Sequence, residues 1–226
     1  MRKLTILCFA MCLILASSAM AMAQKKAVST KFTTSGNFNG ITTDENGESG
    51  GIAVYLTESD GDMYALVTTA AGVLLLPKLL EVKVTGKDMR GIEFTLPDEN
   101  GDRKFKGKVS AAALTLDENG TKSVLKRVCN GTYNDIRLGE GGDYGGMEVY
   151  LTEADGQNYA LVTIAEGILI KPELVEAQVT GKNYDRVAFT LPGDGGGRKF
   201  TGTKSKTGLT LTESGTRTVL KNKCYK

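Results

Sequence analysis

The sequence predicts an all-β protein made of two tandem domains, each a small up-and-down barrel of about eight short antiparallel strands. Three observations support this fold class: the chain repeats itself, apolar residues alternate with polar ones, and turn dipeptides separate the alternating stretches. A compact β-sandwich is the alternative arrangement of the same strands.

The repeat has a period of 95 residues. The stretch "VYLTESDGDMYALV" at 54–67 returns as "VYLTEADGQNYALV" at 149–162, and residues 50–129 align with 145–224 without a gap, about 44 of 80 positions being identical. Solenoid units span only about 20–50 residues, whereas a whole domain has about this length. We therefore expect two β-domains, at 30–129 and 130–226.

Alternation with a period of two marks the strands. Apolar residues occupy every second position in 147–151, 175–179, 92–96 and 105–109, as expected of strands with one buried face. The segment after Pro172 also alternates and is predicted to be a strand, not a helix.

Turn dipeptides separate these strands of five to seven residues, which recur about every eleven residues. Asn-Gly and Asp-Gly tolerate the positive φ that tight hairpins require. Short connections favour a meander, and eight meandering strands can close into a barrel without exposed edges. The dipeptides are Asp60-Gly61, Asn100-Gly101, Asn119-Gly120 and Asp155-Gly156.

Residues 1–23 resemble a cleavable signal peptide. Arg2 and Lys3 precede an apolar run at 4–16, and Ala21-Met22-Ala23 fits the small-x-small cleavage rule. The run is shorter than the roughly 20 residues that span a bilayer. We expect a mature chain that starts at Gln24, has no transmembrane segment and is secreted or periplasmic.

Composition excludes several function classes. Without Arg2 and Lys3 the chain has 26 basic and 26 acidic residues, so it lacks the basic field of a nucleic-acid-binding protein. It has no histidine, which removes Ser-His and Cys-His nucleophile pairs and most catalytic zinc sites. No cofactor motif is present, since the glycine-rich segment 193–198 lies between two predicted strands.

Acidic residues suggest two further kinds of site, a calcium site and a glycosidase active site, and neither is predicted. The loops 58–62 and 98–102 carry oxygen ligands suited to calcium, but Gln157, Gly193 and Gly197 replace three of the acids in the second copy. We therefore predict no metal site. Recurring glutamates would suit a glycosidase, but their positions mostly point outward or into turns. These pairs are Glu58/Glu153, Glu81/Glu176 and Glu118/Glu213.

The opening of each copy resembles the lipocalins and their calycin relatives. Those barrels begin with Gly-x-Trp, and a basic side chain from the last strand packs across the ring. This chain has "GNF" at 36–38 and "GTY" at 131–133, with Lys126 and Lys221 in the two closing strands, although it contains no tryptophan. The resemblance implies a cavity for a small apolar ligand in each domain.

Tyr55 and Tyr150 are the candidate binding residues, with no catalytic residue predicted. Both lie on the strand face opposite the predicted core, and exposed aromatic side chains suit ligand or protein contacts. Packing against a neighbouring strand, or burial between the domains, is the alternative. Arg103, Lys104 and their copies Arg198 and Lys199 indicate a charged hairpin shoulder.

We expect a non-enzymatic binding protein whose partner is an unknown protein, glycan or surface. A second copy of a weak site would raise the apparent affinity through avidity. The alternatives are a calycin-type carrier and, less favoured, an exported hydrolase. Asn119 and Asn130 match the N-glycan acceptor pattern, which is used only in a host that glycosylates.

Cys129 and Cys224 are the two cysteines that follow the signal peptide, and they occupy equivalent positions. Equivalent points of two domains ordinarily lie a domain diameter apart, whereas a disulfide needs Cα atoms within about 7 Å. Each also shares a strand face with a leucine, as a buried free cysteine would. We predict two free, largely buried thiols, with a Cys129–Cys224 disulfide as the alternative.

Overall fold

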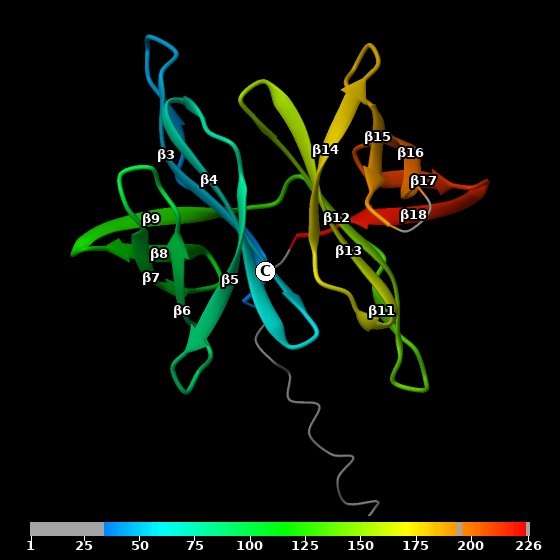
Figure 1. Cartoon of the computed structure of the whole chain (residues 1–226), viewed down its shortest axis with the longest axis horizontal. Coiled ribbons are helices and arrows are strands. Elements are labelled where there is room, and N and C mark those ends of the chain that lie inside the picture. Colours follow the sequence, from blue (N-terminus) through cyan, green and yellow to red (C-terminus); the bar gives the residue numbers. More distant parts are fainter. Residues whose placement is uncertain (1–33, 194–195, 225–226) are drawn as a thin grey trace, which may run out of the picture. The chain divides into compact units, whose positions relative to one another are not determined.

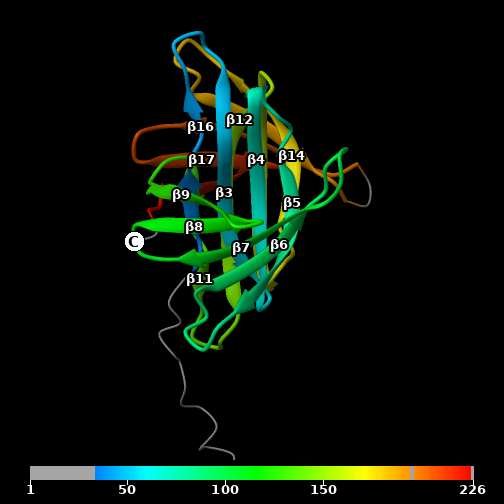
Figure 2. The ribbon, with the colours of Figure 1, turned by 90° about the vertical axis from the view of Figure 1, so that its left-hand side faces the viewer.

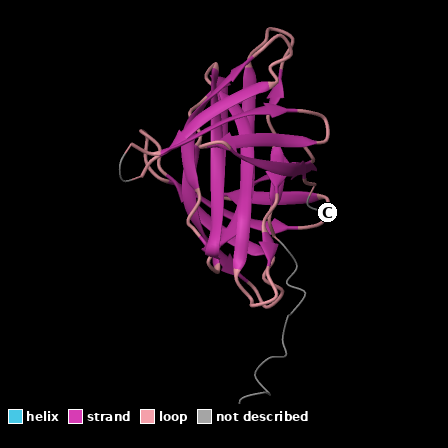
Figure 3. Ribbon diagram, turned by 90° about the vertical axis from the view of Figure 1, so that its right-hand side faces the viewer, coloured by secondary structure: helices cyan, strands magenta, loops and turns pink. Residues whose placement is uncertain are grey.

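The computed structural model describes residues 34–193 and 196–224, which belong to one compact unit, Thr34–Lys226. The predicted signal peptide and its cleavage site after Ala23 lie outside the described residues. The described chain contains strands and no helix, so the all-β prediction is confirmed (Figure 3). In that part of the chain no helix is available to cross a membrane.

Each copy contributes nine strands in the same order. The first copy contains β1 (Gly36–Asn39), β2 (Thr42–Thr43), β3 (Ser49–Ser59), β4 (Asp62–Leu74), β5 (Lys78–Thr85), β6 (Gly91–Leu96), β7 (Arg103–Val109), β8 (Ala113–Glu118) and β9 (Thr121–Val128). The second contains β10 (Thr132–Asn134), β11 (Arg137–Leu138), β12 (Tyr144–Ala154), β13 (Gln157–Leu169), β14 (Glu173–Thr180), β15 (Arg186–Leu191), β16 (Arg198–Lys204), β17 (Gly208–Glu213) and β18 (Thr216–Asn222).

Both copies close into eight-stranded antiparallel barrels, called here barrel 1 and barrel 2 (Figures 1 and 2). In barrel 1, strands β3 to β9 pair in chain order, and β1 pairs with both β9 and β3, which joins the two ends of the sheet. In barrel 2, β10 joins β18 to β12 in the same way. The short strands β2 and β11 extend the edges of β3 and β12. The meander predicted from short connections is therefore present twice.

Three of the four predicted turn dipeptides have the expected backbone geometry, whereas in Asn100-Gly101 only the glycine has positive φ. In Asp60-Gly61, Asn119-Gly120 and Asp155-Gly156 both residues have positive φ, as type I′ turns require. Closure also depends on a glycine: at Gly51, where φ is +115°, an added Cβ would lie 2.4 Å from the Gly40 carbonyl oxygen. Gly146 has the same role in barrel 2, 2.4 Å from the Asp135 carbonyl oxygen.

Inward-facing side chains form one buried cluster in each barrel. In barrel 1 the cluster includes Phe38, Leu56, Phe94, Phe105 and Leu125. In barrel 2 the corresponding cluster is built on Tyr133, Phe189, Phe200, Leu211 and Leu220. Each barrel thus has its own hydrophobic core, which the alternation in the sequence predicted.

Two hairpins are longer than predicted. Strands β3 and β12 have 11 residues each and β4 and β13 have 13, against an expected five to seven. Several consecutive residues are buried in these strands, for example Val54–Thr57 and Tyr159–Thr163, so both faces are covered. One face belongs to the barrel core and the other lies at the junction between the barrels.

We predict that fragments 24–129 and 130–226, expressed separately, each fold. Each contains every strand needed to close its barrel, together with its own core. Far-UV circular dichroism should report β-structure in both, and both should melt cooperatively below the melting temperature of the full chain, because the junction face becomes exposed. Two unfolded fragments would contradict the assignment of independent barrels.

Candidate functional site at the junction of the barrels

The outward faces of the long hairpins meet in a small hydrophobic cluster. Tyr55 and Leu66 from barrel 1 pack with Tyr150 and Leu161 from barrel 2. Tyr55 is 2% exposed and Tyr150 is 8% exposed, so the expectation that both form an exposed binding surface is wrong. The alternative, burial between the domains, is what the structure has, because the tyrosine face of each strand is covered by the other copy.

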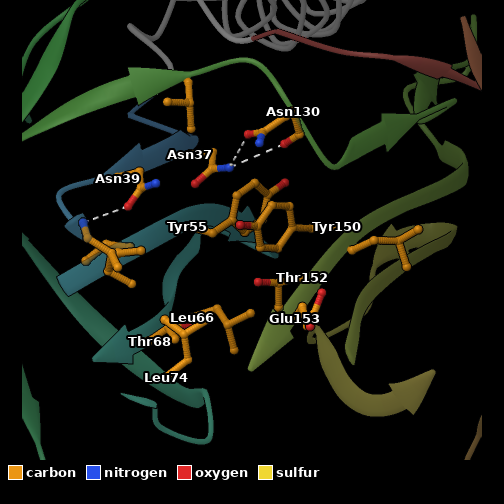
Figure 4. A pocket seen from close by; sticks show the side chains of 15 residues that line it. Asn37, Asn39, Tyr55, Leu66, Thr68, Leu74, Asn130, Tyr150, Thr152 and Glu153 are labelled. Atoms are coloured by element: carbon orange, nitrogen blue, oxygen red, sulfur yellow. Dashed lines mark hydrogen bonds between the residues drawn. The ribbon is translucent and has the colours of Figure 1, made fainter. Parts of the chain in front are cut away.

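The two tyrosine rings stack directly on each other. Their centroids are 4.1 Å apart and their planes differ by 2° (Figure 4). Tyr55 and Tyr150 are equivalent residues of the repeat, so each copy presents the same side chain to the other. Burial raises the pKa of the Tyr150 phenol, while side-chain hydrogen bonds with Thr152 and Asn37 act in the opposite direction.

A buried carboxylate, Glu148 of β12, lies beside this stack and is only 4% exposed. The Tyr55 hydroxyl donates to Glu148 Oε1 at 2.7 Å, and the Thr57 hydroxyl donates to the same oxygen at 3.2 Å. The Asn134 amide donates to Oε2. A buried polar group needs such partners to offset its lost hydration. The carboxylate thus connects barrel 2 to two hydroxyl groups of barrel 1.

Cys129 and Cys224 form a disulfide, with Cα atoms 4.7 Å apart. The prediction of two free, buried thiols is therefore wrong, and Cys129 is exposed. The argument assumed that equivalent points of two domains lie far apart. It fails where the domains are related by an approximate two-fold rotation, because equivalent residues near the axis meet. The Tyr55–Tyr150 stack is a second such meeting point.

Further contacts join the barrels around these two points. The Asn37 amide donates to the backbone carbonyl of Asn130 at 3.3 Å and to its side-chain oxygen at 3.1 Å. The Ser59 hydroxyl donates to the Ile170 carbonyl oxygen at 2.7 Å. The Lys171 ammonium lies 3.4 Å from a Glu81 carboxylate oxygen. The last contact is exposed and contributes little, so the buried contacts define the junction.

A pocket of about 300 Å³ opens at the junction, on one side of the tyrosine stack (Figure 4). Barrel 1 contributes side chains from β1, β3 and β4, including Asn39, Ala53 and Leu74, and barrel 2 contributes Tyr150 and Thr152. Its lining mixes aliphatic side chains with amide and hydroxyl groups. Glu153 also lines the pocket, and its side chain is exposed.

A second hollow of about 590 Å³ lies in the wall of barrel 1 and is called here the wall groove. It forms because β5 pairs with β6 only through Lys83–Thr85. The preceding part of β5, Lys78–Val82, pairs only with β4, and Phe94–Leu96 of β6 pairs only with β7. Apolar core side chains form its floor, and charged residues form its walls. The floor includes Met63, Val82, Phe94 and Phe105, and the walls include Asp62, Glu81, Lys83, Glu93, Lys104 and Lys106.

The recurring arginines and two of the recurring glutamates pair with each other. Arg103 Nε and Nη2 donate to the two carboxylate oxygens of Glu118, both at 2.7 Å. Arg198 binds Glu213 in the same bidentate way, at 2.6 and 2.9 Å. These hydrogen bonds lower the pKa of both glutamates. Each arginine also lies over a core phenylalanine ring, so the predicted charged shoulder is a bidentate ion pair at the barrel rim.

The cation across the first aromatic ring is not the predicted one. The Arg127 guanidinium lies 4.4 Å from the Phe38 ring centroid and donates to the Ser35 carbonyl oxygen at 2.9 Å. Lys126 and Lys221 are exposed. Side chains alternate along a strand, so Arg127 points inward and Lys126 outward. Asn222 occupies the position of Arg127 in barrel 2, beside Tyr133.

Neither a metal-binding cluster nor similarity to known proteins identifies the function of the site. The described residues contain no group of three or more acidic or cysteine side chains positioned to hold a metal ion. Protein-family models, curated protein sequences and solved structures were compared with the chain, and none of the three comparisons finds a match. The geometry of the junction pocket and of the wall groove therefore provides the evidence on what each can bind.

Sequence reasoning missed Glu148 and the junction pocket, although a signal was present. Glu148 precedes the apolar run "VYL", and "YALV" in the next strand is also apolar at consecutive positions. Such a run indicates a strand covered on both faces. Ala53 stands where the second copy has Glu148, so the two copies differ in polarity at this position of the face.

We predict that Tyr55→Phe destabilises the protein more than the matched change Tyr150→Phe. Removal of the Tyr55 hydroxyl leaves the buried Glu148 carboxylate with one donor fewer, which costs about 1–3 kcal/mol. Tyr150 has no carboxylate opposite its hydroxyl. Chemical denaturation of both variants measures the difference. Equal losses, or a larger loss for Tyr150→Phe, would contradict the role given to Glu148.

We predict that the mature protein carries the Cys129–Cys224 bond and that its removal lowers stability. The bond closes a loop of 95 residues, for which chain entropy gives about 4–5 kcal/mol. Cys129→Ser with Cys224→Ser should unfold at a lower denaturant concentration. Mass spectrometry of unreduced, alkylated and denatured protein checks the bond itself, and two alkyl labels per chain would show free thiols.

Proposed function

We propose that this chain is an exported, non-enzymatic binding protein that holds an extended segment of another protein in the wall groove of barrel 1. The observation that carries the proposal is the partial separation of β5 from β6. It leaves one side of each strand without a paired neighbour over Lys78–Val82 and Phe94–Leu96. An extended peptide can add to such edges through main-chain hydrogen bonds.

The side chains of the groove suit this partner. Apolar core residues at the floor offer contact to alternate side chains of an extended segment, while walls of both charge signs favour a polar backbone and a charged partner. The size of about 590 Å³ lies within the range of sites that enclose a ligand. Export follows from the predicted signal peptide, which gives the protein access to extracellular or envelope partners.

Comparison of the copies supports specialisation of the groove. The framework residues Phe94, Thr95, Lys104 and Phe105 recur unchanged as Phe189, Thr190, Lys199 and Phe200. Of the six wall charges, Glu81 and Lys104 recur as Glu176 and Lys199, and the other four do not recur. Asp62, Lys83, Glu93 and Lys106 correspond to Gln157, Gln178, Ala188 and Thr201. A scaffold that is retained while its wall charges differ is expected where one copy has acquired a binding role.

The inward side chains of both barrels favour surface binding over a carrier with one cavity in each domain. They pack as continuous buried clusters around stacked phenylalanine pairs, Phe94–Phe105 and Phe189–Phe200. A calycin-type carrier would need this volume for its ligand. Binding of a protein segment at the barrel wall requires no space in the interior, which stays packed.

We predict that the triple change Lys83→Gln, Glu93→Ala, Lys106→Thr abolishes partner capture without loss of fold. These residues are the ones that barrel 2 carries at equivalent positions, so a folded barrel already accommodates them. Immobilised mature protein is exposed to extracellular and envelope fractions, and the retained proteins are identified. Hydrogen exchange on the complex should slow at β5 and β6.

The matched control is the reciprocal change Gln178→Lys, Ala188→Glu, Thr201→Lys in barrel 2, which should leave capture intact. Thermal melts of both variants check the fold, since cross-strand pairs such as Lys83–Glu93 contribute about 0.2–1 kcal/mol each. A partner retained equally by the barrel 1 variant, or protection located away from β5 and β6, would refute the proposal.

A further inference from the structure

The repeat places an equivalent of the junction pocket in the other half of the junction, and there the Glu148 side chain fills the space. Adding 95 to the numbers of Asn39, Ala53, Tyr150 and Thr152, or subtracting it, gives Asn134, Glu148, Tyr55 and Thr57. Those are the residues that surround the Glu148 carboxylate. Both halves of the junction therefore contain the same tyrosine, threonine and asparagine. They differ in the fourth residue, which is a glutamate in one half and an alanine in the other.

The pocket is located where the second carboxylate would be. Ala53 lines it and has no side chain beyond Cβ, whereas Glu148 fills the equivalent space in the other half. We infer that this pocket is a binding site for a small monocarboxylic acid with an apolar body. The ligand carboxylate would take the place relative to Tyr150, Thr152 and Asn39 that the Glu148 carboxylate has relative to Tyr55, Thr57 and Asn134.

The donor set is already arranged for such a group. The Asn39 side-chain oxygen accepts the Ile41 backbone N–H at 2.8 Å, as the Asn134 oxygen accepts that of Ile136 at 2.9 Å. This bond fixes the amide orientation, so the Asn39 nitrogen takes the position from which the Asn134 nitrogen donates to Glu148. Tyr150 lacks a carboxylate opposite its hydroxyl and contacts Thr152 and Asn37.

The remaining lining includes aliphatic side chains that can contact an apolar body. Ile41, Val54, Leu66, Leu74 and Val128 line the pocket around the hydroxyl and amide groups. Val128 corresponds to Lys223 in the other half, so this position is apolar in the pocket. The volume of about 300 Å³ lies at the small end of ligand sites, which limits the body to a short chain or one ring.

Glu153 at the pocket edge does not exclude an acid. Its side chain is exposed, and water screens exposed charges. The occupied half has a glutamate at the equivalent position, Glu58, and holds the Glu148 carboxylate nevertheless. The same neighbourhood can therefore accept a ligand carboxylate.

Hexanoate is the probe, with 1-hexanol as the matched compound that lacks the carboxylate. Isothermal titration of the mature, disulfide-bonded protein should show one hexanoate site per chain and at least tenfold weaker binding of hexanol. Methyl resonances of Ile41 and Leu74 should shift on titration, which locates the site. Hexanol binding as tight as hexanoate binding would overturn the inference, and so would an absence of hexanoate binding.

Ala53→Glu supplies the missing side chain and should abolish hexanoate binding while preserving or raising the melting temperature. Glu148→Ala makes the reciprocal change and should raise the stoichiometry from one site to two. Thr152→Val, which keeps the side-chain shape, should weaken binding about tenfold through the loss of one hydrogen bond to a charged group. It tests the same point if Ala53→Glu does not fold. Wild-type affinity in either the Ala53→Glu or the Thr152→Val protein would refute the site.

Discussion

The structure depends on one constraint: the outer face of the β3–β4 hairpin must be buried against the equivalent face of the second copy, the β12–β13 hairpin. Tyr55 and Leu66 face away from the barrel 1 core and would otherwise present a bare apolar surface. Tyr150 and Leu161 have the same need in barrel 2. Joining these faces through a two-fold rotation buries both, and it brings Tyr55 onto Tyr150 and Cys129 onto Cys224. The disulfide and the stack are thus two results of one symmetry.

This symmetry makes small sequence differences informative. A duplicated face that contacts itself would be identical on both sides of its axis if the copies were identical. The difference between Ala53 and Glu148 breaks that identity at a buried position, so one side carries a carboxylate and the other a pocket. In the same way, four of the six wall charges of the groove in barrel 1 are replaced by uncharged residues in barrel 2. Both proposed sites are found where the copies differ, on a framework that they share.

Much of the fold could be predicted from the sequence because barrel cores follow simple alternation. Ile92, Phe94 and Leu96 alternate with polar residues and point inward as expected. Asp60-Gly61 and Asn119-Gly120 form the predicted tight turns. Ser214-Gly215 is a turn of the same kind, with positive φ at both residues. It was not predicted, because Ser-Gly is a weaker signal for such a turn than Asn-Gly or Asp-Gly. The lengths of β3 and β4 were not predicted, because alternation marks a strand with one buried face. These two strands are buried on both faces and do not alternate.

The candidate site was harder to predict because it depends on contacts between copies. Tyr55 and Tyr150 face away from the barrel cores, as predicted, yet an outward aromatic side chain does not reveal whether solvent or another domain covers it. Cys129 and Cys224 could be paired only with knowledge of the axis. Arg127 was overlooked beside Lys126 because a one-residue shift along a strand reverses the face. Each error concerns which surface is covered, and local sequence does not encode that directly.

The central claim is that the two barrels form one body held by the self-complementary faces of the repeat. Residual dipolar couplings of backbone amides in weakly aligned mature protein test it most directly, since each barrel provides its own set of couplings. A single alignment tensor should fit the couplings of both barrels together, with equal magnitude and orientation in each. Separate tensors of different magnitude for barrel 1 and barrel 2 would show independent motion and would contradict the account.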